Sequence, residues 1–124
     1  MMGELPPLAP AFFERPPMSQ KFSLAETPHG AFGVLAKLEF PGQPARAFTR
    51  REATIVSRAL NAVARGTRAE RQIYMSPIAS DHDFEARVAE KGIVVIADGC
   101  VDVLLDWNDV DALSSRFASF GSGG

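Results

Sequence analysis

Three consecutive residues, Asp81-His82-Asp83, are the strongest candidate for chemistry in the sequence. An imidazole between two carboxylates could bind a metal ion or act as a general base. However, neighbouring residues on a helix point in different directions, and no second histidine or cysteine lies at ligand spacing. Such acids are also typical of a helix start, where they complement the helix dipole. We therefore predict no metal site and keep an enzyme with a site around His82 as an alternative hypothesis.

The remaining nucleophiles and imidazoles lack the context of a catalytic motif. Ser76 has no Gly-x-Ser-x-Gly frame, and His29 lies in a Pro-His-Gly turn. Cys100 is the only cysteine, which excludes an intrachain disulfide, and we interpret it as a semi-buried structural thiol. No glycine-rich phosphate loop is present. We predict no cofactor and no catalytic residue, although His29, His82, Asp81 and Ser76 could converge in a folded enzyme.

Charge is segregated along the chain, although the formal net charge is only −2. Residues 46–71 contain seven arginines and two glutamates, whereas residues 81–111 contain nine acids and two basic residues. The seven arginines are Arg46, Arg50, Arg51, Arg58, Arg65, Arg68 and Arg71. The small total therefore conceals a dipolar molecule.

Part of the basic segment is ordered along a predicted helix. Arg51, Arg58 and Arg65 are seven residues apart, a spacing that drifts by only about 20° per step on a straight helix. Thr54 and Asn61 fall between them, and the five residues form one stripe. Planar guanidinium groups suit carboxylates or phosphates. We predict that this stripe binds a partner, although a solvated outer face would have the same pattern.

Trp107 is the only tryptophan and a second candidate contact residue. Tryptophan is enriched at interfaces because it combines a large apolar body with a polar edge. It follows a predicted strand and precedes a predicted helix, where one edge could stay in contact with water. Core packing is the alternative role.

The helix that carries the stripe has clear start and stop signals. Thr49 and Glu52 match a capping box, and Gly66 is placed to end the helix after Arg65. Its apolar face consists of Val56, Ala59, Leu60 and Val63.

Alternating apolar residues and turn signals predict four strands. They cover residues 32–40, 72–75, 93–97 and 101–105, and Asp98-Gly99 predicts a hairpin turn between the last two.

Residues 84–91 are ambiguous. Leading acids, a trailing Lys91 and Gly92 favour a short helix, whereas alternation at Phe84, Ala86 and Val88 favours a strand. We predict the helix. A last helix should start at a cap of Asn108 or Asp109, and its apolar face consists of Val110, Leu113, Phe117 and Phe120.

These elements follow the order β-α-β-α-β-β-α. They predict an α+β fold, a two-layer sandwich of one small, mostly antiparallel sheet of about four strands with two or three helices.

The length of 124 residues fits one domain, which we place at residues 21–120. Five prolines predict a disordered leader over residues 1–20, and the glycine-rich residues 121–124 predict a flexible tail. Residues 1–17 could be a native tail or precede a true start at Met18. No apolar stretch approaches the roughly 20 residues of a membrane span, and no signal peptide is recognisable. We predict a cytoplasmic, bacterial protein without membrane association.

Three functions remain open. The first is a non-catalytic interaction or regulatory module that binds a protein through the basic helix face, as a monomer or a weak homodimer. The second is nucleic-acid binding through the same arginines, which the absence of interleaved aromatic residues disfavours. The third is the enzyme around His82.

Overall fold

A computed structural model describes residues 21–66 and 71–123, so the predicted leader over residues 1–20 lies outside the described residues. The elements in chain order are β2 (Ser23–His29), β3 (Gly33–Glu39), β4 (Arg46–Phe48), α1 (Arg50–Ala64), β5 (Gln72–Met75), β6 (Phe84–Ala89), β7 (Gly92–Ile96), β8 (Val103–Asp106) and α2 (Trp107–Ser122). The predicted α+β class is confirmed. The predicted single sheet and element order are wrong, because the described residues form two antiparallel sheets and two helices.

The first sheet has the strand order β2-β3-β4. The prediction for residues 32–40 is confirmed in its body, since β3 buries Ala36 and Leu38 and exposes Lys37 between them. Its neighbour β2 was not predicted. That strand lies at the sheet edge, where Pro28 costs no ladder hydrogen bond, and its residues show no apolar alternation.

The second sheet has the order β5-β6-β7-β8, and it overturns the helix predicted over residues 84–91. Phe84 and Ala86 are buried in β6 and Arg87 is exposed. The alternation of apolar residues, which favoured a strand, was therefore the correct signal. Strands on both sides of β6 pair with its backbone, and this non-local gain exceeds a weak local preference for helix. Gly92 begins β7 with φ +157° instead of ending a helix, and a Cβ there would collide with the Leu105 carbonyl oxygen.

The antiparallel pairing of β7 with β8 is confirmed, but the connection is longer than a two-residue turn. It covers residues 97–102, with Gly99 at φ +72°. Val101 therefore lies in the connection and not in the strand, and it is 76% exposed.

The last helix, α2, starts earlier and ends later than the sequence predicted. Its N-cap is Asp106, not Asn108 or Asp109, and Asp109 is the partner in the capping box. The apolar face is confirmed, with Val110, Leu113, Phe117 and Phe120 all buried. Gly121 and Ser122, two residues of the predicted tail, belong to the helix.

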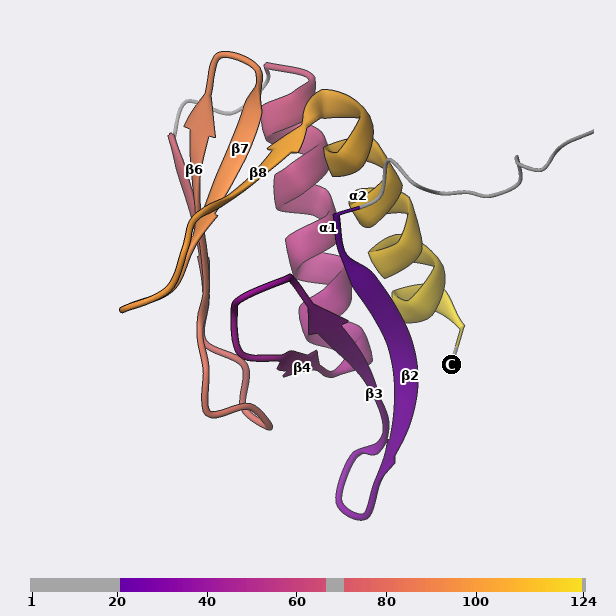
Figure 1. Cartoon of the computed structure of the whole chain (residues 1–124). Coiled ribbons are helices and arrows are strands. Elements are labelled where there is room, and N and C mark those ends of the chain that lie inside the picture. The colour runs from indigo at the N-terminus through magenta and orange to yellow at the C-terminus, as the bar shows by residue number, and fades with distance from the viewer. Residues whose placement is uncertain (1–20, 67–70, 124) are drawn as a thin grey trace, which may run out of the picture.

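The two helices lie side by side and antiparallel (Figure 1). The Ser57 hydroxyl donates to the Ser114 carbonyl oxygen at 2.8 Å, and the Ser114 hydroxyl donates to the Ser57 carbonyl oxygen at 3.0 Å. Nearer the start of α1, Gly121 faces Thr54 so closely that a Cβ would collide with the Thr54 hydroxyl. Small residues thus bring the helices together, which fixes the side of α1 that can face outward.

The core lies between the helices and both sheets. The Phe48 ring of the first sheet meets Phe84 of the second sheet and Phe117 of α2 edge-on, with centroids 6.1 and 5.0 Å apart. These rings are fully buried, and such pairs add to the burial of their apolar area. Neither helix among the described residues is long and apolar enough to cross a membrane.

Arg46 joins the two sheets from inside the protein. It belongs to β4 and is only 1% exposed. Its Nε donates at 2.8 Å to the carbonyl oxygen of Asp83, the residue before β6, and its guanidinium lies over the Phe40 and Phe84 rings. Burial lowers the pKa of Arg46 from its usual value. Nearby, Gln43 donates to the carbonyl oxygens of Val95 and Val101.

Candidate partner-binding face of α1

The helix α1 begins as the sequence predicted. The Thr49 hydroxyl accepts the Glu52 N–H at 3.2 Å, and the Glu52 carboxylate accepts the Thr49 N–H at 2.9 Å. The buried face consists of Ala53, Val56, Ser57, Ala59, Leu60 and Val63. Because this face packs on the sheets and on α2, the opposite face of α1 is left to solvent.

The arginines of the predicted stripe lie on that opposite face. Arg51, Arg58 and Arg65 are all exposed. The side chain of Arg65 donates to Asn61 Oδ1 at 3.0 Å, which is a contact within the helix. Within residues 21–66 and 71–123, neither Arg51 nor Arg58 has a side-chain hydrogen bond, and the only ion pair joins Lys37 to Glu39. Their guanidinium N–H groups therefore have no acceptor among the described residues.

Thr54, the fourth member of the stripe, lies at the border with α2. Its hydroxyl donates to the Arg50 carbonyl oxygen at 3.0 Å, and the side chain is half-buried against Gly121. Asn61 remains exposed but accepts the Arg65 bond. The accessible cations of the stripe are therefore its three arginines.

Two isoleucines that sequence reasoning missed flank the arginines. Ile55 on α1 is 48% exposed, and Ile78 is 73% exposed. The Ile78 N–H donates to the Glu52 carboxylate at 2.8 Å, so the loop after β5 lies against the first turn of α1. The available signal was the seven-residue spacing of Ile55 and Ala62, which places them on the same side of the helix as the arginines.

Arg46 and Arg50 of the basic segment are used inside the fold. Arg50 donates to the Phe120 carbonyl oxygen at 2.6 Å and lies 4.5 Å from the centre of the Phe120 ring. It thereby satisfies a carbonyl at the end of α2. Arg68 lies outside the described residues. The basic segment therefore contains two kinds of arginine. Arg46 and Arg50 bond to the protein itself, whereas Arg51 and Arg58 are exposed.

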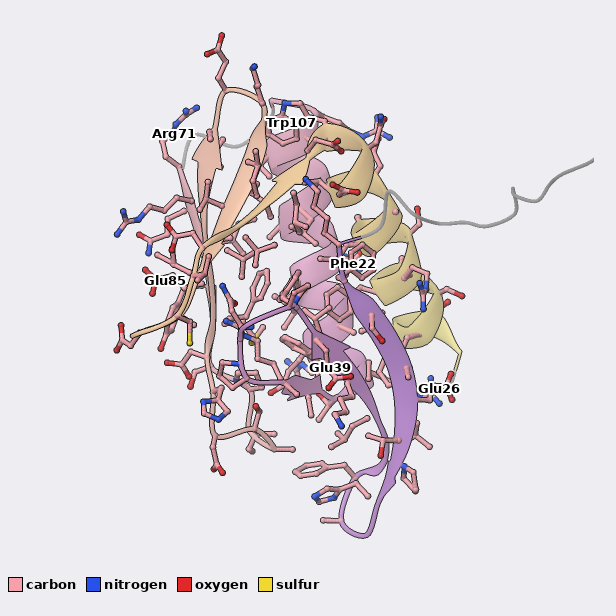
Figure 2. All side chains as sticks on the ribbon, viewed as in Figure 1. Phe22, Glu26, Glu39, Arg71, Glu85 and Trp107 are labelled. Atoms are coloured by element: carbon pink, nitrogen blue, oxygen red, sulfur yellow. The ribbon has the colours of Figure 1, made fainter. Side chains whose placement is uncertain are left out.

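Trp107 is not part of the outward face of α1. It is the first residue of α2, packs against the core and donates its indole N–H to the Glu90 carbonyl oxygen at 3.2 Å. Figure 2 shows it where α2 begins. The half-buried ring agrees with core packing, the alternative role considered for it.

Asp81-His82-Asp83 does not cap a helix, because the element that follows is β6. All three residues are exposed. The Tyr74 hydroxyl donates to Asp83 at 2.5 Å, which lowers the pKa of Asp83 and raises that of Tyr74. This bond joins the end of β5 to the start of β6.

A cavity of about 420 Å³ lies beside this segment. Its lining combines carboxylates with the buried Arg46 and includes Asp81, His82, Asp83, Glu85 and Asp98. Neither Ser76 nor Cys100 belongs to it. Among the described residues no group of three or more histidine, cysteine or acidic side chains is arranged to hold a metal ion.

The other predicted candidates for chemistry are not brought to this cavity. The His29 Nδ1 atom accepts the N–H groups of Ala31 and Phe32, so its ring closes the hairpin between β2 and β3. The Cys100 thiol is half-buried, and its hydrogen bond within the described residues goes to the Asp98 carbonyl oxygen at 3.5 Å. No contact within the described ranges joins His29 to His82.

A scan against protein-family models and searches of curated proteins and of solved structures found no match to the chain.

Proposed function

We propose that this protein is a non-catalytic interaction module that binds an acidic segment of another protein through the outward face of α1. The observation that carries the proposal is the state of Arg51 and Arg58. They are exposed on one side of a well-anchored helix, and neither has an acceptor among the described residues. Planar guanidinium groups that are not engaged internally can form bidentate bonds with carboxylates.

The apolar flank favours a protein over a nucleic acid. Ile55 exposes a large aliphatic side chain beside the arginines, and Ile78 exposes another in the loop that is bonded to Glu52. Phosphate groups offer nothing to bury these side chains. No aromatic residue lies on α1 to stack with bases. A protein segment that combines acids with apolar residues matches both features.

The test measures binding by fluorescence anisotropy with two probes. One is a peptide of about 20 residues made of Glu, Leu and Ala, and the other is a duplex DNA of about 20 base pairs. The Arg51→Glu/Arg58→Glu variant should lose at least about tenfold of the peptide affinity, because two attractive contacts become repulsive. The matched control, Arg87→Glu/Lys91→Glu, changes the net charge equally at exposed positions on β6 and in the turn after it, and this variant should keep the peptide affinity.

Two outcomes would reject the proposal. In the first, the wild-type chain binds no acidic peptide at low ionic strength, or both double variants lose the same affinity. In the second, duplex DNA binds more tightly than the peptide and its affinity falls steeply with salt, which would establish the nucleic-acid alternative.

The segregated charge also leads us to propose a monomer that associates weakly with itself at low ionic strength. The basic face of one copy would meet the acidic segment 81–111 of another. Sedimentation velocity at low and high salt tests this, and an unchanged mass would reject electrostatic self-association.

A further inference from the structure

The outward face of α1 has a regular repeat that includes apolar residues. Residues Arg51, Ile55, Arg58, Ala62 and Arg65 follow one another at intervals of four, three, four and three. Side chains at this average spacing of 3.5 residues form a nearly straight stripe along a helix, and a second helix can pack along such a stripe. The partner of this stripe is not α2, because α2 contacts the side of α1 that carries Thr54 and Ser57.

The composition of the stripe suits a contact with a charged helix. Ile55 lies between Arg51 and Arg58 and is 48% exposed, so it offers apolar surface to bury. In helix pairs of this kind, apolar contacts supply affinity, and flanking charges select the partner and its orientation. Ile78 extends the apolar surface near the first turn, where its backbone is bonded to Glu52.

The arginine spacing distinguishes a helical partner from an extended one. Seven residues of helix rise about 10.5 Å, so side chains at seven-residue intervals on a second helix match the arginines of α1 one to one. In an extended strand, residues on one face recur every 6.6–6.8 Å or so and soon fall out of step. From Arg51 to Arg65 the stripe is about 21 Å long, which corresponds to about four helical turns.

We infer that the partner segment is an amphipathic α-helix of about four turns. It carries carboxylates at seven-residue intervals and at least one aliphatic residue that packs on Ile55. The inference rests on the proposed function, because it names the kind of acidic segment that binds there.

The experiment uses three peptides of about 21 residues and equal net charge with the full chain. In the heptad peptide, Glu and Leu repeat at three- and four-residue spacing on an Ala background. The scrambled peptide has the same composition without the repeat. The proline peptide replaces two central Ala residues of the heptad peptide with Pro, which breaks its helix.

The heptad peptide should bind at least about tenfold more tightly than either of the others, and its helical circular dichroism should increase on binding. Ile55→Gln should weaken its binding about tenfold, because a large part of the burial of one isoleucine is lost. Leu104→Gln is the matched control. Leu104 is 42% exposed on the second sheet, and its replacement should leave the affinity unchanged.

The outcomes separate the two proposals. If the wild-type chain binds none of the peptides, the proposed function itself fails. If the three peptides bind equally, or if Ile55→Gln has no effect, acidic binding stands and the helical partner is overturned.

Discussion

The helices α1 and α2 both begin with a capping box, and they pack against each other over most of their lengths, but their outward faces differ. The outward face of α2 consists largely of small and polar residues, among them Asn108, Asp111, Ser115, Ala118 and Ser119. The one arginine there, Arg116, donates to the Leu24 carbonyl oxygen at 2.6 Å. On α1, by contrast, Arg51 and Arg58 have no such acceptor among the described residues.

The comparison shows what solubility alone requires. A face such as that of α2 keeps a helix hydrated with small and polar residues and with one arginine that is bonded to the chain itself. The free arginines and the exposed Ile55 of α1 go beyond this requirement, which is why we place the binding surface there. If this difference holds, substitutions on the inner faces of the two helices should lower stability, and substitutions on their outward faces should not.

The largest effect is expected at the inner face of α2. Phe117→Ala should lower the free energy of unfolding by about 3–5 kcal/mol, because a fully buried ring in contact with Phe48 is replaced by a cavity. Urea unfolding measures this. On the outward face, Ser115→Ala should change the stability by less than about 0.5 kcal/mol. A loss below 1 kcal/mol or so for Phe117→Ala would show that the contact is looser than described.

The contact between the helices comes next. In Gly121→Ala, the new Cβ meets the Thr54 hydroxyl, so we expect a loss of about 1–2 kcal/mol after the gain in helix propensity is counted. The double variant Thr54→Ala/Gly121→Ala removes the hydroxyl and should recover most of this loss. Stabilisation by Gly121→Ala alone would contradict the close approach.

Arg50 and Arg58 both lie on α1, but only Arg50 should contribute to the stability of the fold. Arg50→Ala should cost about 1–2 kcal/mol, because it removes the bond to the Phe120 carbonyl oxygen and the contact with that ring. Arg58→Ala should change the stability by less than about 0.5 kcal/mol. Equal losses in thermal or urea unfolding would mean that Arg58 has a structural role.

The smallest effect concerns the capping box of α2 and has a defined pH dependence. Burial raises the pKa of the Asp109 carboxyl in the folded state above its unfolded value. The folded state then binds the proton more tightly, so Asp109 makes stability fall as pH rises from about 3.8 through the folded pKa.

Asp109→Asn removes this ionisation while it keeps an oxygen that can accept the Asp106 N–H. The stability of the wild-type chain relative to Asp109→Asn should therefore decrease over that pH window. Urea unfolding at a series of pH values measures the difference. A difference that is constant with pH would show that Asp109 titrates alike in the folded and unfolded chains.

What the sequence could predict follows from how local each feature is. Thr49, Glu52 and the apolar periodicity fix α1 within its own segment, and its cap and its buried face were predicted correctly. For residues 84–89 the local signals favoured a helix, whereas backbone pairing with β5 on one side and with β7 on the other decides for a strand. The edge strand β2 carries too little apolar alternation to be recognised.

The same distinction holds for the candidate site. The outward direction of Arg51, Arg58 and Arg65 follows from helical spacing alone. The half-burial of Thr54 does not, because it depends on where Gly121 of α2 lies. The same spacing directs Ile55 outward. The contact between Ile78 and Glu52 could not be read from a linear pattern, because it depends on how the loop after β5 packs.

The position of Arg46 has a consequence for how this chain folds. Arg46 lies in the first sheet. The Asp83 carbonyl oxygen, next to β6 of the second sheet, accepts a hydrogen bond from it and compensates part of the loss of hydration. Without the second sheet, the first sheet would bury the Arg46 guanidinium without this acceptor, which raises its free energy. The two sheets should therefore melt in one cooperative transition, and a fragment that ends after α1 should not keep its structure.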